Sequence, residues 1–276
     1  MTILRFGTAG IPLSAKEDGY EGAIRVLTQL GLNAMEIEFV RGVNMPDATA
    51  DFLKKETAKN DIALTVHAPY FINLNSAEKA KIAASKERII GAAIKGASCG
   101  AVSVVFHAAF YMGAPAEKTF QNVKAELEDI TGQLEKRNIS IQLRPELTGK
   151  PTQFGDLDEI IRLSAEVPGI FPCVDFAHYH ARYNGKYNSY KDFRDAIKKI
   201  RAGLGDSAVQ DMHIHMSGIK YTPKGEVKHL ELAESDIDYK GLLKALKDED
   251  AGGIIISESP NIEQDAVLMQ EYFKKL

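Results

Sequence analysis

Eight short runs of β-branched and other apolar residues recur along the chain, and stretches with helical periodicity separate them. The runs are ILRFGTA (3–9), AMEIEFV (34–40), IALTVHA (62–68), AVSVVFHA (101–108), ISIQLRPE (139–146), IFPCVDF (170–176), VQDMHIHMS (209–217) and GIIISES (253–259). This alternation is typical of βαβ units, in which crossover helices join parallel strands. Eight such units predict an α/β fold, a closed (β/α)8 barrel. An open doubly wound sheet is the alternative.

The stretches between these runs predict helices, and none of them reads as a linker. Helical periodicity is found over 20–31, 76–100, 116–137, 154–167, 190–205, 238–250 and 264–276. Since α/β barrels often reach this length as one domain, we expect residues 1–276 to form a single domain. The chain contains no GxxxxGK[ST] loop and no GxGxxG after a strand, so we expect no nucleotide cofactor.

Bulk composition excludes several classes of protein. The 276 residues carry a net charge of −4, so nothing in the total charge advertises a nucleic-acid binder, although a local basic patch could still bind one. Two cysteines cannot build a disulfide framework, and MTILRFGTAGIP resembles a strand and turn rather than a signal peptide. No apolar run reaches membrane-spanning length. We expect a cytoplasmic, monomeric protein that does not enter membranes.

The histidines fall in a strongly non-random pattern. Six of the seven lie at or just past the predicted C-terminal end of a strand, and His229 follows in the long connection after the seventh strand. The six are His67, His107, His178, His180, His213 and His215. In a barrel, this end carries the active site. Singly, each is readily explained as an ordinary core or surface histidine, and His180 and His213 are the weakest members.

Three carboxylates end predicted strands at equivalent places, namely Glu146, Asp175 and Glu258. Each follows an apolar run, where an unpaired charge is costly to bury, although a salt bridge or a helix cap would also explain one of them alone. Imidazole with carboxylate suits zinc, iron or manganese, so the joint pattern predicts a metal site. The donors outnumber those of one tetrahedral ion. Asp175 should point inward, while His178 reaches from the following loop. The surplus of donors implies two or more ions, and closely spaced ions are suited to displacement at phosphorus.

The order of these motifs resembles one known family. HAPYFINL, VVFHAAF, RPELTGKPTQFG, VDFAHYH, HIHMSG, VKHLEL and ISESP follow one another as in the endonuclease IV family of zinc-dependent apurinic/apyrimidinic endonucleases. These enzymes use a xylose isomerase-like TIM barrel, and the resemblance spans almost the whole chain. It implies a DNA-repair hydrolase whose partner is double-stranded DNA with an abasic site.

The resemblance also implies a ligand set of two or three zinc ions, with manganese as an alternative metal. His67 and His107 match ligands of the first ion, Glu146 bridges to the second, and Asp175, His215 and Glu258 complete the second. His178 and His229 match two ligands of the third ion. The family has an aspartate two residues before that last histidine, where this chain has Val227. Either the third ion is missing or more weakly bound, or another residue replaces the aspartate, for which Glu226, Glu231 and His180 are the candidates.

The implied reaction is attack of a metal-bridging hydroxide on the phosphate 5′ to an abasic site. Zinc lowers the pKa of bound water from ~15.7 toward ~7. Glu146 and Glu258 are the implied catalytic residues. Arg41, Tyr70 and Phe71 match positions that the family inserts into DNA, although the two aromatic side chains could instead pack under the barrel rim. Lys220, Lys224 and Lys228 could meet phosphates or form an ordinary solvated loop.

Two other functions remain open on the sequence. Glu146, Asp175, His215 and Glu258 also match the single-metal quartet of sugar isomerase and epimerase barrels, in which glutamates move protons. A barrel that binds DNA without cutting it is the third possibility. The full set of donors for two ions argues against that third possibility.

Overall fold

The computed structural model describes residues 3–276 and confirms the eight predicted strands. They are β1 (Leu4–Ala9), β2 (Ala34–Glu38), β3 (Ala63–His67), β4 (Ser103–Phe106), β6 (Gln142–Pro145), β8 (Cys173–Asp175), β9 (Met212–Met216) and β12 (Gly253–Ser257). All pair in parallel, in the order β6-β4-β3-β2-β1-β12-β9-β8. Parallel bridges from Leu143 to Ile170 and from Glu146 to Cys173 join the two ends. The sheet is therefore a nearly closed (β/α)8 barrel, and the open sheet is excluded.

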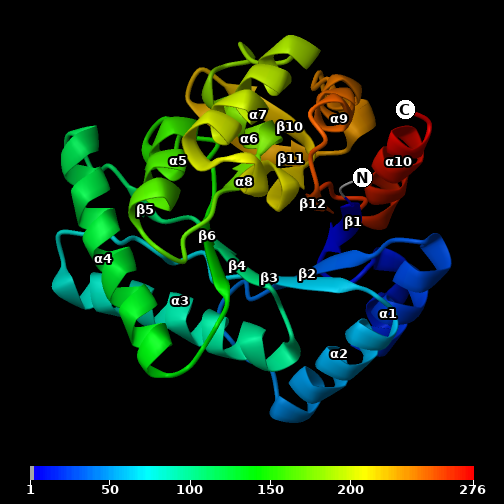
Figure 1. Cartoon of the computed structure of the whole chain (residues 1–276), viewed down its shortest axis with the longest axis horizontal. Coiled ribbons are helices and arrows are strands. Elements are labelled where there is room, and N and C mark those ends of the chain that lie inside the picture. Colours follow the sequence, from blue (N-terminus) through cyan, green and yellow to red (C-terminus); the bar gives the residue numbers. More distant parts are fainter. Residues whose placement is uncertain (1–2) are drawn as a thin grey trace.

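Helices surround the strands on the outside of this barrel (Figure 1). Seven match the predicted stretches: α1 (Gly19–Leu30), α3 (Lys79–Cys99), α4 (Ala116–Lys136), α5 (Leu157–Glu166), α7 (Tyr190–Leu204), α9 (Tyr239–Asp248) and α10 (Glu263–Lys274). Sequence analysis missed α2 (Asp47–Lys59), because its buried face is only Ala50, Leu53 and Thr57 and gives little periodicity. Short elements are η1 (Leu13–Asp18), α8 (Asp206–Gln210) and η2 (Leu232–Glu234). No helix within residues 3–276 has the length and apolar character needed to cross a membrane.

Local sequence explains where several elements begin and how closely they pack. Asp156 and Ser189 start α5 and α7 with capping boxes, each side chain accepting a hydrogen bond from the third backbone N–H of its helix. Between β1 and β2 the backbones approach so closely that a Cβ on Gly7 would lie 2.3 Å from the carbonyl oxygen of Ala34. Only glycine permits this contact.

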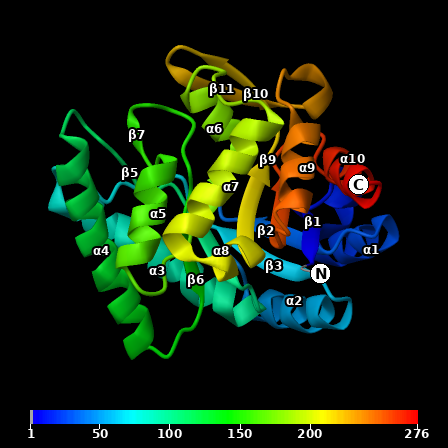
Figure 2. The same ribbon diagram turned by 45° about the horizontal axis from the view of Figure 1, so that its top comes forward.

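Further elements extend past the C-terminal ends of the strands. They are α6 (Phe176–Arg182), the hairpin β10 (Gly218–Thr222) and β11 (Gly225–Leu230), and the pair β5 (Ala109–Phe110) and β7 (Gln153–Phe154). The hairpin packs against α6 at one end of the barrel (Figure 2). Two placements expected from the sequence are wrong. His178 and His180 lie in α6 rather than in a loop, and His213 lies in the first half of β9 rather than at its end.

Candidate metal centre

The C-terminal end of the barrel, with α6 and the β10–β11 hairpin, brings all eight predicted metal ligands together in three overlapping groups. Within each group, one donor atom per residue lies within 4.8 Å of the others. The groups are His67, His107 and Glu146; then Glu146, Asp175, His215 and Glu258; then Asp175, His178 and His229. Glu146 belongs to the first two groups and Asp175 to the last two, so the three form one continuous centre.

In the first group both histidines face one carboxylate oxygen. Nε2 of His107 lies 2.9 Å from Oε2 of Glu146, and Nε2 of His67 lies 3.2 Å from the same atom. His67 is oriented from behind, because its Nδ1 is 2.8 Å from the carbonyl oxygen of Ala68 and donates to it. The remaining nitrogen of His67 faces the centre and would become a lone-pair donor once a metal ion displaced its proton, as in metal-binding histidines.

The second group contains polar atoms that lack partners. Asp175 uses Oδ1 to accept the backbone N–H of His178 at 2.6 Å and thereby caps α6. Among the described residues, its Oδ2 has no hydrogen-bond partner, nor do Oε1 of Glu146, Nδ1 of His215 and Oε2 of Glu258, and all four atoms are buried. Unpaired buried groups of this kind are costly. A divalent cation would satisfy these atoms, so the residues fit a metal.

In the third group two imidazole rings face one another. His178 donates from Nδ1 to the carbonyl oxygen of Leu147 at 3.0 Å, and His229 donates from Nδ1 to that of Glu258 at 3.2 Å. Their Nε2 atoms lie 3.3 Å apart. Burial alone would lower the pKa of His178, but the neighbouring carboxylates raise it well above its usual value, so a proton on its Nε2 can bridge the two nitrogens, and a cation near both could take the place of that proton.

A β-bulge brings Glu226 to this group. In the hairpin, Lys220 pairs with Lys228 whereas Tyr221 pairs with Glu226, which leaves Val227 as the extra residue. An extra residue changes the alternation of faces, so Glu226 lies on the same face as His229. Oε2 of Glu226 is 3.5 Å from Nε2 of His178, while Val227 is 51% exposed.

Two glycines make room for Glu226. A Cβ on Gly149 would lie 2.7 Å from Cβ of Glu226 and 2.9 Å from the His178 ring. The backbone N–H of Glu226 donates to the carbonyl oxygen of Gly149 at 2.9 Å. Gly225, with φ +93°, passes so close that its Cβ would lie 2.4 Å from the same oxygen. Of the three candidates to replace the family's aspartate, only Glu226 is held against this group, because His180 contacts Asp236 and Glu231 precedes η2.

The centre carries an excess of negative charge. Burial alone would lower the pKa of His67, but Glu146 and Glu38 raise it to about 10. Burial raises the pKa of Glu258 well above its usual value, and Glu146 and Asp175 raise it further. Burial also raises the pKa of Glu38 to about 7. Bound cations would relieve this repulsion.

Sequence analysis did not single out Glu36 and Glu38. Both lie on the inward face of β2, and Glu38 pairs in register with His67. The available signal was the pair of acidic residues two positions apart in the apolar run AMEIEFV, since alternate strand residues share a face.

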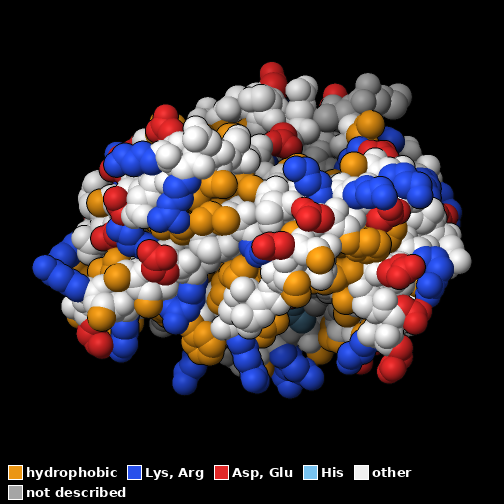
Figure 3. All heavy atoms as spheres, turned by 90° about the horizontal axis from the view of Figure 1, so that it is seen from below, with side chains coloured by type: hydrophobic (Ala, Val, Ile, Leu, Met, Phe, Trp, Pro, Cys, Tyr) orange, Lys and Arg blue, Asp and Glu red, His pale blue; other side chains and the backbone are white. Residues whose placement is uncertain are grey.

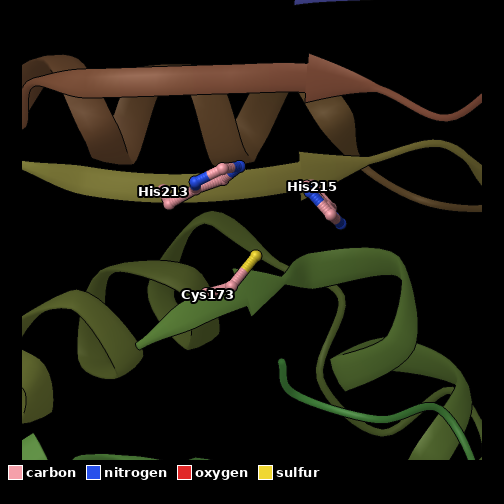
Figure 4. Close-up of side chains that lie close together, drawn as sticks. All are labelled: Cys173, His213 and His215. Atoms are coloured by element: carbon pink, nitrogen blue, oxygen red, sulfur yellow. The ribbon is translucent and has the colours of Figure 1, made fainter. Parts of the chain in front are cut away.

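Two histidines, His180 and His213, lie outside the three donor groups. His180 contacts the Tyr187 carbonyl oxygen and Asp236. His213 lies deeper in the barrel, near Cys173, whose side chain points from β8 toward β9 (Figure 4). Burial raises the pKa of the Cys173 thiol to about 12, so the thiol stays protonated. Cys99 and Cys173 are both free and buried, consistent with the absence of a disulfide framework.

The loops around the barrel mouth expose aromatic and basic groups. Tyr70 is 55% and Phe71 67% exposed, so neither packs under the rim. Arg41, after β2, is exposed, as are Lys220 and Lys228 on the hairpin. In Figure 3 a histidine is visible in a recess, with hydrophobic groups beside it and lysine or arginine side chains further along the same edge.

The chain belongs to the xylose isomerase-like TIM barrel family, whose profile matches residues 24–276. It is 46% identical over 274 residues to an uncharacterized protein of Methanocaldococcus jannaschii, covering 99% of this chain and 98% of the relative. It is 24% identical over 243 residues to a probable endonuclease 4 of Aster yellows witches'-broom phytoplasma, covering 84% and 82%.

Solved structures of an endonuclease and of an epimerase-like protein have the same fold as this chain. Endonuclease IV from Thermus thermophilus superposes with a TM-score of 0.74 at 20% identity, covering 98% of this chain and all of that one. A D-tagatose 3-epimerase-like protein superposes with a TM-score of 0.70 at 17% identity, covering 97% and 96%. The fold alone therefore does not distinguish an endonuclease from an epimerase, and the side chains of the site must do so.

Proposed function

We propose that this protein is a metal-dependent phosphodiester hydrolase that cuts DNA 5′ to an abasic site. One observation carries the proposal: three donor groups are joined through shared Glu146 and Asp175. A single-metal sugar enzyme needs only the middle group. The other two groups have a purpose when several close ions are bound, as in phosphodiester hydrolysis. The similarity to probable endonuclease 4 supports the same choice.

The donors would divide among three ions. His67 and His107 would hold the first, and Glu146 would be shared with the second. Asp175, His215 and Glu258 would complete the second. His178 and His229 would hold the third, with Glu226 in the part of the missing aspartate. Zinc suits these nitrogen and oxygen donors, and manganese is the alternative.

Bound ions would lower the pKa of water and neutralise charge on the phosphate. The protein's own part is orientation. Glu146 directly follows strand β6. Its carboxylate contacts His67 and His107 of the first donor group and His215 of the second. Glu258 follows β12 with Oε2 free of hydrogen bonds, and it would accept a proton from, and align, the attacking water.

Recognition would use the mouth loops. Arg41 and the hairpin lysines would contact backbone phosphates, and Tyr70 with Phe71 would fill the gap left by an extruded nucleotide. The tyrosine ring lies 5.7 Å from the ring of His67, so a wedge at this place borders the metal centre directly.

The test is cleavage of a duplex oligonucleotide with one tetrahydrofuran abasic-site analogue, by protein whose metal content has been measured. We expect incision 5′ to the lesion, lost in chelator and restored by Zn²⁺ or Mn²⁺. The same duplex without the lesion is the control. No incision by protein that contains its metal would overturn the proposal.

A sugar isomerase or epimerase is the second candidate. The observation in its favour is Glu38, a carboxyl group beside the centre that would repel a phosphate when ionised but could transfer protons to a sugar. Assays of ketohexoses and ketopentoses for C3 epimerisation, with one bound ion per chain, would favour it over the hydrolase.

A further inference from the structure

A second layer of polar side chains lies beneath the metal centre, inside the barrel. It consists of Glu36, Thr65, Ser103 and His213, each no more than 1% exposed. Glu36 precedes Glu38 by two residues in β2, and His213 precedes His215 by two in β9, so each deep residue shares the inward face of its mouth neighbour. The proposed chemistry uses none of the four.

We infer that Glu36 is a positioning residue that sets the tautomer and orientation of His215. Oε1 of Glu36 lies 2.9 Å from Nε2 of His215, although among the described residues neither atom forms a hydrogen bond of regular geometry. On the opposite side of the ring, Nδ1 of His215 lies 3.5 Å from Glu146 and 3.4 Å from Glu258. The imidazole ring therefore stands between a deep carboxylate and the donors of the second ion.

The chemistry of the two partners determines the direction of this contact. An ionised carboxylate only accepts hydrogen bonds, and a neutral imidazole carries one N–H and one lone pair. With Glu36 facing Nε2, the proton belongs on Nε2 and the lone pair on Nδ1, where the second ion is proposed. Carboxylate–histidine–metal arrangements of this kind fix the ligand tautomer and raise ligand basicity.

The deep layer also holds the carboxylate itself in place. Thr65 donates to Oε2 of Glu36 at 2.7 Å, and Nε2 of His213 lies 3.1 Å from that same oxygen. Nδ1 of His213 is 3.1 Å from the Ser103 hydroxyl. Oε2 thus has its own hydrogen-bond partner in Thr65, and Oε1 is left facing His215. A buried carboxylate needs a compensating charge, which a cation beyond the imidazole ring supplies.

This inference rests on the metal centre of the proposed function and not on the identity of the substrate. The variant that tests it is Glu36→Gln, which keeps the side-chain size and removes the charge. Its matched control is Glu263→Gln, the same change at a buried carboxylate that accepts from the backbone of Leu13 and Ser14, away from the centre. Both variants are titrated with Zn²⁺ against a chelator, and both are loaded with Co²⁺ for visible spectroscopy.

We expect Glu36→Gln to bind one ion about 10 to 100 times more weakly and to change the Co²⁺ spectrum, because second-layer partners of ligands have effects of this size. Glu263→Gln should keep the wild-type affinity and spectrum, whatever it costs in stability. In a His215→Asn background, Glu36→Gln should weaken binding no further, because Glu36 acts through His215.

Each of the other outcomes would overturn either the role of Glu36 or the metal centre itself. If wild-type protein binds metal and Glu36→Gln binds it equally well with an unchanged spectrum, the inference is wrong and the proposed function stands. Equal losses in Glu36→Gln and Glu263→Gln would reduce the effect to general core damage and also overturn it. Wild-type protein that binds no metal would overturn the metal centre together with the inference. If Glu36→Gln is unstable, Glu36→Asp is the second variant. It keeps the charge but moves the carboxylate oxygens away from His215, and it should weaken metal binding in the same way.

Discussion

The first and third donor groups have different supports. His67 ends β3, and His107 and Glu146 directly follow β4 and β6, so three neighbouring barrel strands hold the first group. The third group takes only Asp175 from a barrel strand, β8, whereas His178 and His229 come from α6 and the β10–β11 hairpin, which are added beyond the strands. Barrel strands fix both direction and register, whereas a hairpin can absorb an extra residue. A donor on the hairpin can therefore move by one position in sequence and keep its place in space.

This difference explains why the chain has Val227 where the family it resembles has an aspartate. In an alignment without gaps, the valine appears to remove a ligand. The bulge places Glu226 on the inward face instead, and Gly149 leaves space for its side chain. A comparable shift at His67 or Glu146 would move the donor to the other face of a strand that both neighbours hold in register.

Breaking the first group should have the largest effect. Glu146→Gln removes the carboxylate shared by two donor groups, so we expect incision to fall about 10³-fold or more, on the scale of losing a main electrostatic stabiliser. Single-turnover cleavage with metal analysis measures this. Activity within a factor of 10 of wild type would show that Glu146 does not bridge ions.

Breaking the third group should cost less. Glu226→Gln should lower incision by roughly 10 to 100-fold and metal content by one ion, because the two histidines remain. Val227→Asp is the control, since its side chain points outward, and it should change neither quantity. Rescue of Glu226→Gln by Val227→Asp would show that the hairpin can slip back to regular pairing.

The exposed rim tests the substrate rather than the metals. Replacing both Tyr70 and Phe71 by alanine should weaken binding of abasic duplex about 10-fold, or about 1.4 kcal/mol, which lies within the 1–3 kcal/mol that one stacked base can contribute. Binding of Zn²⁺ should not change. Met112→Ala, at an exposed side chain on a different loop, is the control. An unchanged affinity in fluorescence anisotropy would remove the two aromatic residues from the DNA interface.

The smallest effect concerns Glu38 in the metal-free protein. Its pKa is about 7 in the folded chain against 4.5 ordinarily, so the folded state holds the proton more tightly than the unfolded state does. Stability should therefore fall as pH rises from 4.5 to 7. Glu38→Gln should flatten this part of the pH profile in urea denaturation. A profile unchanged by the substitution would contradict the shift.

The barrel could be predicted because its signal is repetitive: eight apolar runs alternate with helical stretches, and strand ends are where histidines and acids gather. Glu146, Asp175 and Glu258 stand out as charges directly after apolar runs. Helix α2 could not be predicted with the same ease, because one leucine, one alanine and one threonine make a weak stripe.

The rest of the centre depends on distances across the barrel. Glu36 lies far from His215 in sequence but 2.9 Å away in space, and no local pattern pairs them. The role of Glu226 depends on a bulge, since regular alternation would place it on the face opposite His229. His180 also sits among the donors in sequence, yet Asp236 and Tyr187 occupy both of its nitrogens.

The bulge makes Val227 an inserted residue rather than a substituted one. Many residues could replace the valine there, because its side chain faces water. Deleting it would leave Glu226 two residues before His229, and regular alternation would then keep both side chains on one face. An alignment without a gap therefore counts the valine as a lost ligand, whereas a one-residue gap at the valine places Glu226 in the ligand's column.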